Sequence, residues 1–344
     1  MTQDLLEVFR SMDFSDKDEG ITLNDRVLII DGMNTFIRSF AAIPTMDENG
    51  NHIGGVTGFL KSVGYVTRKF KPSRVYVIFD GKGGSKRRRE IYPDYKAGRK
   101  PLTRLNRTYD MTTEQDEQDL MRYQLVIVAK ALMKLPITTI TLDHVEADDI
   151  ISYIAQHVVE GGGESIIYST DKDFLQLVGD GIKVWNPVRK KTYIPETVLE
   201  DYIIHPNNFL LYRALTGDTS DNLPGIKGLG IKTLLKFMPG FVTEEKLDLD
   251  DVITIAESSK SKVMSKIVDQ KEIIQRNLIL MSLLSVMISD NNKMKILNKI
   301  NSPQLSLHKY GLTKLLIETN ILPSMQNYDS WVVSTFNSLT RFDG

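Results

Sequence analysis

Four short apolar runs, rich in β-branched residues, alternate along this chain with longer segments whose apolar residues recur every three or four positions. The runs are VLIID at 27–31, RVYVIFD at 74–80, ITTITLDHVE at 137–146 and SIIYSTDKD at 165–173. Short runs of this composition are typical of strands buried on both faces. Segments with helical spacing begin at Val56, Leu120 and Ala147. The alternation predicts an α/β fold with a mostly parallel central sheet and flanking helices.

Each of these runs ends in carboxylates. The acids at or just beyond the four ends are Asp31, Asp80, Glu146, Asp148, Asp149, Asp171 and Asp173. Ligands of open parallel sheets bind outside the carboxyl ends of the strands, so we expect these side chains to converge on one edge. The alternative for any single acid is a solvated turn residue or a helix N-cap.

Asp218 and Asp221, in the segment GDTSD, bring the number of acids to nine. Crowded carboxylates repel one another unless a positive charge lies among them. The chain has no cysteine, and none of its five histidines has ligand spacing with another. Oxygen ligands alone favour Mg²⁺ or Mn²⁺. Nine acids exceed what one ion needs, so we expect two ions that act on a phosphodiester, with a single structural ion as the alternative.

Composition limits the class of protein. A chain of 344 residues is long enough for one large or two modest domains, and without cysteine it has no disulfides. No apolar run approaches the length of a membrane span, and the polar N-terminus is unlike a signal peptide. We expect an intracellular monomer without membrane contact. The net charge of −1 conceals strong segregation of basic and acidic residues.

Basic residues crowd into one segment, GKGGSKRRREIYPDYKAGRK, which begins directly after Asp80. Cations and tyrosines beside an acid-lined site suit a substrate with phosphates and stackable bases. The candidate DNA contacts in this segment are Lys82, Arg87, Tyr95 and Arg99. The alternatives are a solvated face or, for KRRR, a nuclear import signal.

The segment GDTSDNLPGIKGLGIKT, at 217–233, places Gly225, Gly228 and Gly230 closely before Lys232. A nucleotide-binding P-loop needs glycine directly before the lysine, but here Ile231 intervenes. We therefore expect a helix-turn-helix hairpin that contacts duplex phosphates without reading bases. Its residues are Gly225, Gly228, Gly230 and Lys232. Outward carbonyls in such a turn could also hold a monovalent cation.

In this order, VLIIDG, VIFDG, YPDYKAGR, VEADD, STDKDF and GDTSDNLPGIKGLGIKT resemble the motifs of the 5′-nuclease, or flap endonuclease, family. Within it the chain looks most like free-standing phage 5′-3′ exonucleases of the T-even ribonuclease H type. The resemblance implies a PIN-like α/β core, two divalent metals, and a helix-three-turn-helix element that binds duplex and K⁺. It also implies cleavage near the 5′ end of flapped or nicked DNA and RNA/DNA, as in primer removal during replication.

The resemblance also assigns roles by motif position. Asp31, Asp80, Glu146 and Asp148 would surround one metal, and Asp149, Asp171, Asp173, Asp218 and Asp221 would complete it or hold the second. Lys96 and Arg88 would contact the scissile phosphate. A helical arch would lie near 97–118, within a wider region at 86–118. The expected location is the cytoplasm of a phage-infected bacterium, and a single-strand-binding protein or a sliding clamp is an expected partner.

The expected organisation is an N-terminal extension at 1–24, a nuclease core at 25–194, a helical lobe at 195–285 and a C-terminal region of unassigned role at 286–344. Two other functions share some of these features. A non-catalytic binder of branched DNA would show gaps in the carboxylate set. A PIN-type ribonuclease of single-stranded RNA would need the acids but not the duplex-binding turn.

Overall fold

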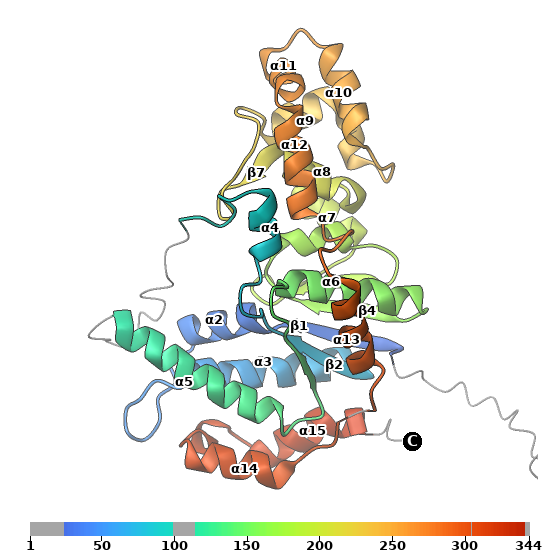
Figure 1. Ribbon diagram of the computed structural model, residues 1–344. Coiled ribbons are helices and arrows are strands. Elements are labelled where there is room, and N and C mark those ends of the chain that lie inside the picture. The colour runs from blue at the N-terminus through green and yellow to red at the C-terminus, as the bar shows by residue number, and fades with distance from the viewer. Residues whose placement is uncertain (1–23, 99–113, 304, 341–344) are drawn as a thin grey trace, which may run out of the picture.

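The computed structural model describes residues 24–98, 114–303 and 305–340. Its centre is a six-stranded sheet in the order β3, β2, β1, β4, β5, β6 (Figure 1). The strands are β1 Arg26–Asp31, β2 Arg74–Ile78, β3 Thr138–Ile140, β4 Glu164–Tyr168, β5 Ile182–Asn186 and β6 Lys191–Tyr193. The first five are parallel to their neighbours, and β6 is antiparallel to β5. The predicted mostly parallel sheet is confirmed.

Two predicted strands are shorter than their apolar runs. The run at 137–146 forms a strand only over Thr138–Ile140, and the run at 165–173 leaves the sheet after Tyr168 and forms the 3-10 helix η1, Lys172–Leu177. Beyond the two strand ends, Asp143 and Asp171 accept hydrogen bonds from the backbone amides of Lys82 and Asp173. The sequence did not predict β5 and β6, which complete one side of the sheet.

Helices cover both faces of the sheet. Successive strand residues point to opposite sides, and both sets are apolar here, so both faces are buried. Leu28 and Ile30 of β1 pack toward α2 (Gly32–Ala42), α3 (Gly54–Phe70) and α5 (Glu114–Leu132). Val27 and Ile29 pack toward α6 (Ala147–Glu160) on the other face. Strand residues on both sides are fully buried, as continuous apolar strands require.

A helical lobe stands on the α6 side of the sheet (Figure 1). Its helices are α7 Pro195–Tyr202, α8 Pro206–Thr216, α9 Ile231–Phe237, η2 Pro239–Val242, α10 Leu249–Glu257, α11 Lys262–Asp269 and α12 Lys271–Met281. Between α8 and α9 lies a short antiparallel pair, β7 Gly217–Asp218 with β8 Leu223–Pro224. The lobe shares a continuous apolar core with the sheet, which fixes its position over the carboxyl ends of the strands.

The C-terminal region, which is weakly patterned in sequence, is part of the core. It contains α13 Asp290–Ile300, α14 Lys309–Glu318, η3 Leu322–Ser324 and α15 Tyr328–Thr340. Leu312, Leu316, Val332 and Phe336 are buried in the same cluster as α3 and α5. Apolar residues four apart put these side chains on one helical face. The guanidinium of buried Arg74, in β2, donates to the carbonyls of Ile300 and Ser302.

The basic segment forms the short helix α4, Lys86–Ile91, between the sheet and the lobe. The predicted arch region at 86–118 includes α4 and the beginning of α5, but its residues 99–113, including Arg99, lie outside the described residues. Most of the predicted N-terminal extension, 1–23, also lies outside them. In the described part of the chain, no helix is long and apolar enough to cross a membrane.

Candidate active site

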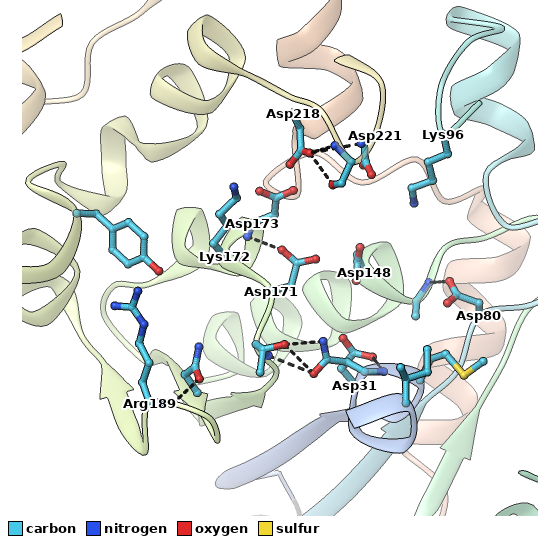
Figure 2. A pocket seen from close by; sticks show the side chains of 18 residues that line it. Asp31, Asp80, Lys96, Asp148, Asp171, Lys172, Asp173, Arg189, Asp218 and Asp221 are labelled. Atoms are coloured by element: carbon cyan, nitrogen blue, oxygen red, sulfur yellow. Dashed lines mark hydrogen bonds between the residues drawn. The ribbon is translucent and has the colours of Figure 1, made fainter. Parts of the chain in front are cut away.

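The carboxyl edge of the sheet opens into a cavity of about 520 Å³ (Figure 2). Seven of the nine predicted acids line it: Asp31, Asp80, Asp148, Asp171, Asp173, Asp218 and Asp221. Lys96 lines the same cavity. The acids at the strand ends therefore lie in the same cavity as Asp218 and Asp221, although more than 40 residues of sequence separate the two groups.

Several of these acids occupy their positions because they cap helices. Asp31 ends β1 and accepts a hydrogen bond from the Asn34 amide, which makes it the N-cap of α2. Asp171 caps η1 in the same way through the Asp173 amide. Asp80 accepts from the amide of Ala147 at the start of α6. The capping role and convergence at one edge, which we treated as alternatives, occur together.

Three of the acids, Asp31, Asp148 and Asp171, lie in the middle of the cavity (Figure 2), and we name them the central acids. Burial raises the pKa of Asp31 to about 6, and Asp171 and Asp80 add to the effect. Burial and the neighbouring acids Asp171 and Asp31 raise the pKa of Asp148 well above its usual range. Burial also raises the pKa of Asp171. Ionisation of the central acids is therefore unfavourable in the protein alone, and a bound cation would offset this cost.

These residues fit a divalent cation. Their donors are oxygens only, the ligands that Mg²⁺ and Mn²⁺ prefer, and their raised pKa values show that a positive charge there would be favourable. Within the described ranges, no three acidic or histidine side chains already form a compact ligand set. Since Mg²⁺ keeps several waters when bound, ligation partly through water is compatible with this spacing.

Beside the cavity lies a mostly buried cluster, which we name the α4 wall: Arg88, Tyr95, Lys96, Glu146 and Asp149, of which Lys96 lines the cavity. The buried Arg88 guanidinium binds both oxygens of Asp149, at 2.7 and 2.8 Å, and Glu146 at 3.1 Å. The Lys96 ammonium donates to the other Glu146 oxygen at 2.8 Å. Burial alone would raise the pKa of Glu146, but Arg88 and Lys96 outweigh it and lower that pKa. In contrast to the central acids, this wall is electrostatically compensated.

The α4 wall places several predicted site residues away from the cavity. Glu146 and Asp149 are buried against Arg88 and do not line the cavity. The Nε of Arg88 donates a hydrogen bond to the Leu280 carbonyl. Tyr95 is only 3% exposed, and its hydroxyl donates to Asp221 and Glu146. A buried ring cannot stack on a base, so this placement does not match the stacking predicted for Tyr95. The metal-binding role of Glu146 and Asp149 and the phosphate contact of Arg88 stay predictions.

Two further predicted contacts of the basic segment, Lys82 and Arg87, lie outside the cavity lining. Lys82 is exposed, and its amide donates to Asp143. The Arg87 guanidinium donates to the carbonyl of Met287. Lys96, with a side chain 16% exposed, is the one predicted phosphate contact that reaches the cavity within the described residues.

A second cluster beside the cavity, the α8 wall, consists of Arg213, Asp173 and Asp218, of which the two acids line the cavity. Arg213 Nε donates to Asp173 at 2.8 Å, and its terminal nitrogen donates to Asp218. Burial acts to raise the pKa of Asp218, but bonds from Ser220 and Arg213 lower it to about 2. Burial and Asp171 nevertheless raise the pKa of Asp173 to about 6. Arg213 was not among the predicted site residues, although its spacing of four from the apolar Phe209 places a charge on the buried face of α8.

The predicted duplex-binding residues gather in the connection between α8 and α9. Gly217 and Gly225 pack backbone against backbone, since a Cβ on Gly225 would lie 2.1 Å from the Thr216 carbonyl oxygen. Gly228 has a φ of +93°, which favours glycine. Gly230 precedes α9, and Lys232 is exposed in its first turn. The contact with DNA and the K⁺ site stay predictions.

Comparison with known proteins agrees with this fold. Residues 26–203, more than half of the chain, match the family of 5′-3′ exonuclease N-terminal resolvase-like domains. A 5′-3′ exonuclease of Aquifex aeolicus is 31% identical over 220 residues, which cover 64% of this chain and 71% of that protein. The chain therefore belongs to the 5′-3′ exonuclease family, hydrolases that act on phosphodiester bonds.

Other relatives extend the comparison. The thermostable DNA polymerase I of Thermus thermophilus is 34% identical over 223 residues, which are 64% of this chain and 25% of that protein. A solved structure of bacteriophage T5 flap endonuclease, a complex with DNA and metal ions, shares the fold at a TM-score of 0.61 and 20% identity, over 85% of this chain and 98% of that one. The Aquifex and Thermus relatives are bacterial, so they do not support the expected phage origin or phage-infected host.

Proposed function

We propose that this protein is a divalent-metal-dependent 5′-3′ exonuclease and flap endonuclease. It hydrolyses phosphodiester bonds near the 5′ end of duplex or branched DNA and of RNA/DNA hybrids. The observation that carries the proposal is the group of central acids, whose uncompensated charge lies beside Lys96 in one cavity. Family membership supports the reaction.

Each side chain has a defined task in this proposal. Two Mg²⁺ or Mn²⁺ ions, when bound, would activate water and stabilise the leaving oxygen of the phosphodiester. The central acids, with Asp80, Asp173, Asp218 and Asp221, would hold these ions. Lys96 would offset the charge that develops on the phosphate, and Glu146 keeps its ammonium at the cavity edge. Arg88 would join Lys96 only after releasing part of its contact with Asp149.

The α8–α9 connection would hold the duplex. Gly228 and Gly230 leave its backbone open, and Lys232 adds a cation at the start of α9. Backbone amides and a lysine contact phosphates without reading sequence. K⁺ bound by carbonyls of this turn would strengthen the contact. The lobe at 195–285 would then bind duplex while the core at 25–194 cuts.

The biological role we propose is removal of RNA primers and adjacent DNA during lagging-strand replication, in the cytoplasm. The match to DNA polymerase I supports this role, because a quarter of that replication-type enzyme is similar to this chain. A single-strand-binding protein or a sliding clamp is the proposed partner, and the acting species is a monomer.

The test compares 5′-labelled substrates: a flapped duplex, a nicked RNA-primed duplex and single-stranded RNA, each with Mg²⁺ or EDTA. We expect Mg²⁺-dependent release of short 5′ fragments from the two duplexes. Asp171→Asn should abolish the release, because it removes a central acid. Asp143→Asn is the matched control, since Asp143 follows β3 but is exposed outside the cavity.

Other results would replace the proposal. Tight binding of the flapped duplex without cleavage in any divalent ion would identify a non-catalytic binder. Cleavage confined to free RNA would identify a single-strand ribonuclease.

A further inference from the structure

Arg213 joins two acids that come from different parts of the fold. Its side chain is buried in α8, with 5% of the residue exposed. Asp173 lies in η1, directly beyond the end of β4, and Asp218 lies in β7, beyond the end of α8. The same guanidinium donates to Asp173 from Nε, to Asp218 from one terminal nitrogen, and to the Gly217 carbonyl from the other.

This arrangement fixes geometry as well as charge. A guanidinium is planar and rigid, so two carboxylates bound to it have a fixed separation and orientation. A lysine ammonium on a flexible stem would supply the same charge without this constraint. The other oxygen of Asp218 accepts hydrogen bonds from the amide and hydroxyl of Ser220. These bonds also help to fix the orientation of the carboxylate.

We propose that Arg213 is a positioning residue that sets Asp173 and Asp218 at the separation needed for the second divalent cation. The inference rests on the proposed function, which needs two cations, and assigns a residue that no sequence motif indicated. Through Arg213, the affinity of the second site depends on the docking of α8 against η1. Partners that orient metal ligands affect metal affinity about 10- to 100-fold.

The sign of the effect separates this role from simple charge compensation. If Arg213 only neutralised acids, its removal would make the cavity more negative and tighten cation binding. If it positions the two acids, its removal weakens binding at the second site despite the added negative charge. Replacement by lysine keeps the charge and removes the rigid fork, so it isolates the geometric part.

The experiment is calorimetric titration of the metal-free protein with Mn²⁺, without DNA, for the wild type, Arg213→Gln and Arg213→Lys. We expect two classes of site in the wild type. In both variants the dissociation constant of the weaker class should rise about 10-fold or more, and the tighter class should change little. Arg26→Lys is the control, because Arg26 pairs with Glu164 at the opposite end of the strands.

Tighter or unchanged Mn²⁺ binding in both variants would overturn the inference while leaving the proposed function intact. A wild type that binds no second Mn²⁺ and cleaves no substrate would instead overturn the proposed function. Urea unfolding in EDTA shows whether each variant is folded. If Arg213→Gln does not fold, Arg213→Lys decides, and the Mg²⁺ concentration for half-maximal cleavage should rise in parallel with its Mn²⁺ constant.

Discussion

The central acids and the two walls of the same cavity are built from the same residue type but differ in electrostatic compensation. The walls have a buried arginine each: Arg88 holds Asp149 and Glu146, and Arg213 holds Asp173 and Asp218. In the described part of the chain, no salt bridge reaches the central acids, whose pKa values are raised. The two buried arginines thus pair with carboxylates beside the cavity, although Asp173 keeps a raised pKa, and the middle is left for a cation that the protein does not itself supply.

The largest expected effect concerns the middle of the cavity. Asp148→Asn should lower Mg²⁺-dependent cleavage by about 10³-fold, or about 4 kcal/mol of activation free energy. The same change should increase the stability of the metal-free protein, because it removes a buried charge. Urea unfolding in EDTA and single-turnover cleavage measure the two quantities. A loss of stability in EDTA would contradict the distinction between the central acids and the walls.

In the α4 wall, removal of a charged side chain should lower the stability of the protein rather than increase it. Arg88→Met should lower the free energy of unfolding by about 3–5 kcal/mol, since it leaves Asp149 and Glu146 buried without their partner. Arg26→Met removes an exposed pair with Glu164 and should cost less than about 1 kcal/mol. Asp149→Asn added to Arg88→Met should recover part of the loss. Urea unfolding at pH 7 checks all three variants.

The pH dependence of the metal-free protein should come partly from Asp31 and Asp173, whose pKa values burial raises to about 6. A carboxyl with a raised pKa is neutral in the folded protein below about pH 6, whereas in the unfolded chain it ionises near pH 4. Its destabilising effect is therefore absent below pH 4, grows between pH 4 and 6 and is complete above pH 6.

Stability in EDTA should consequently fall by on the order of 2 kcal/mol per group as pH rises through this window. Thermal unfolding from pH 4.5 to 7.5 measures the slope. Asp31→Asn should flatten it, and so should Mg²⁺ at matched ionic strength. An identical slope in Asp31→Asn would show that other groups account for it.

The smallest effect concerns Asp218, whose pKa of about 2 depends partly on Ser220. Ser220→Ala removes the hydroxyl bond to Asp218 and should raise this pKa and lower stability by about 1 kcal/mol. Thr219→Ala, an exposed neighbour, should change stability by less than half of that. NMR titration of the Asp218 carboxyl and urea unfolding provide the two readings.

The sequence predicted the carboxyl edge well, because that part depends on local rules. Asp31, Asp80 and Asp171 follow apolar strands, and parallel strands bring their ends together whatever the details of packing. The partners of Arg88 could not be predicted, since Asp149 is 61 residues away and the pairing depends on how α4 lies over α6. Arg213 was missed because a single charge in an apolar helix does not show which buried partner it meets. β5 is as long as β2 and β4, but Lys183 interrupts its apolar residues, and β6 has only three residues.

The hydrogen bonds from Arg74 to the carbonyls of Ile300 and Ser302 join residues 226 and 228 positions apart. During synthesis, β1 and β2 emerge from the ribosome long before α13 to α15, which cover the sheet edge and part of one face. Contacts at such large sequence separation slow folding. Until the helices cover them, the apolar strands can aggregate with other chains. The strands that carry the first acids therefore depend for part of their cover on helices that lie far later in the chain.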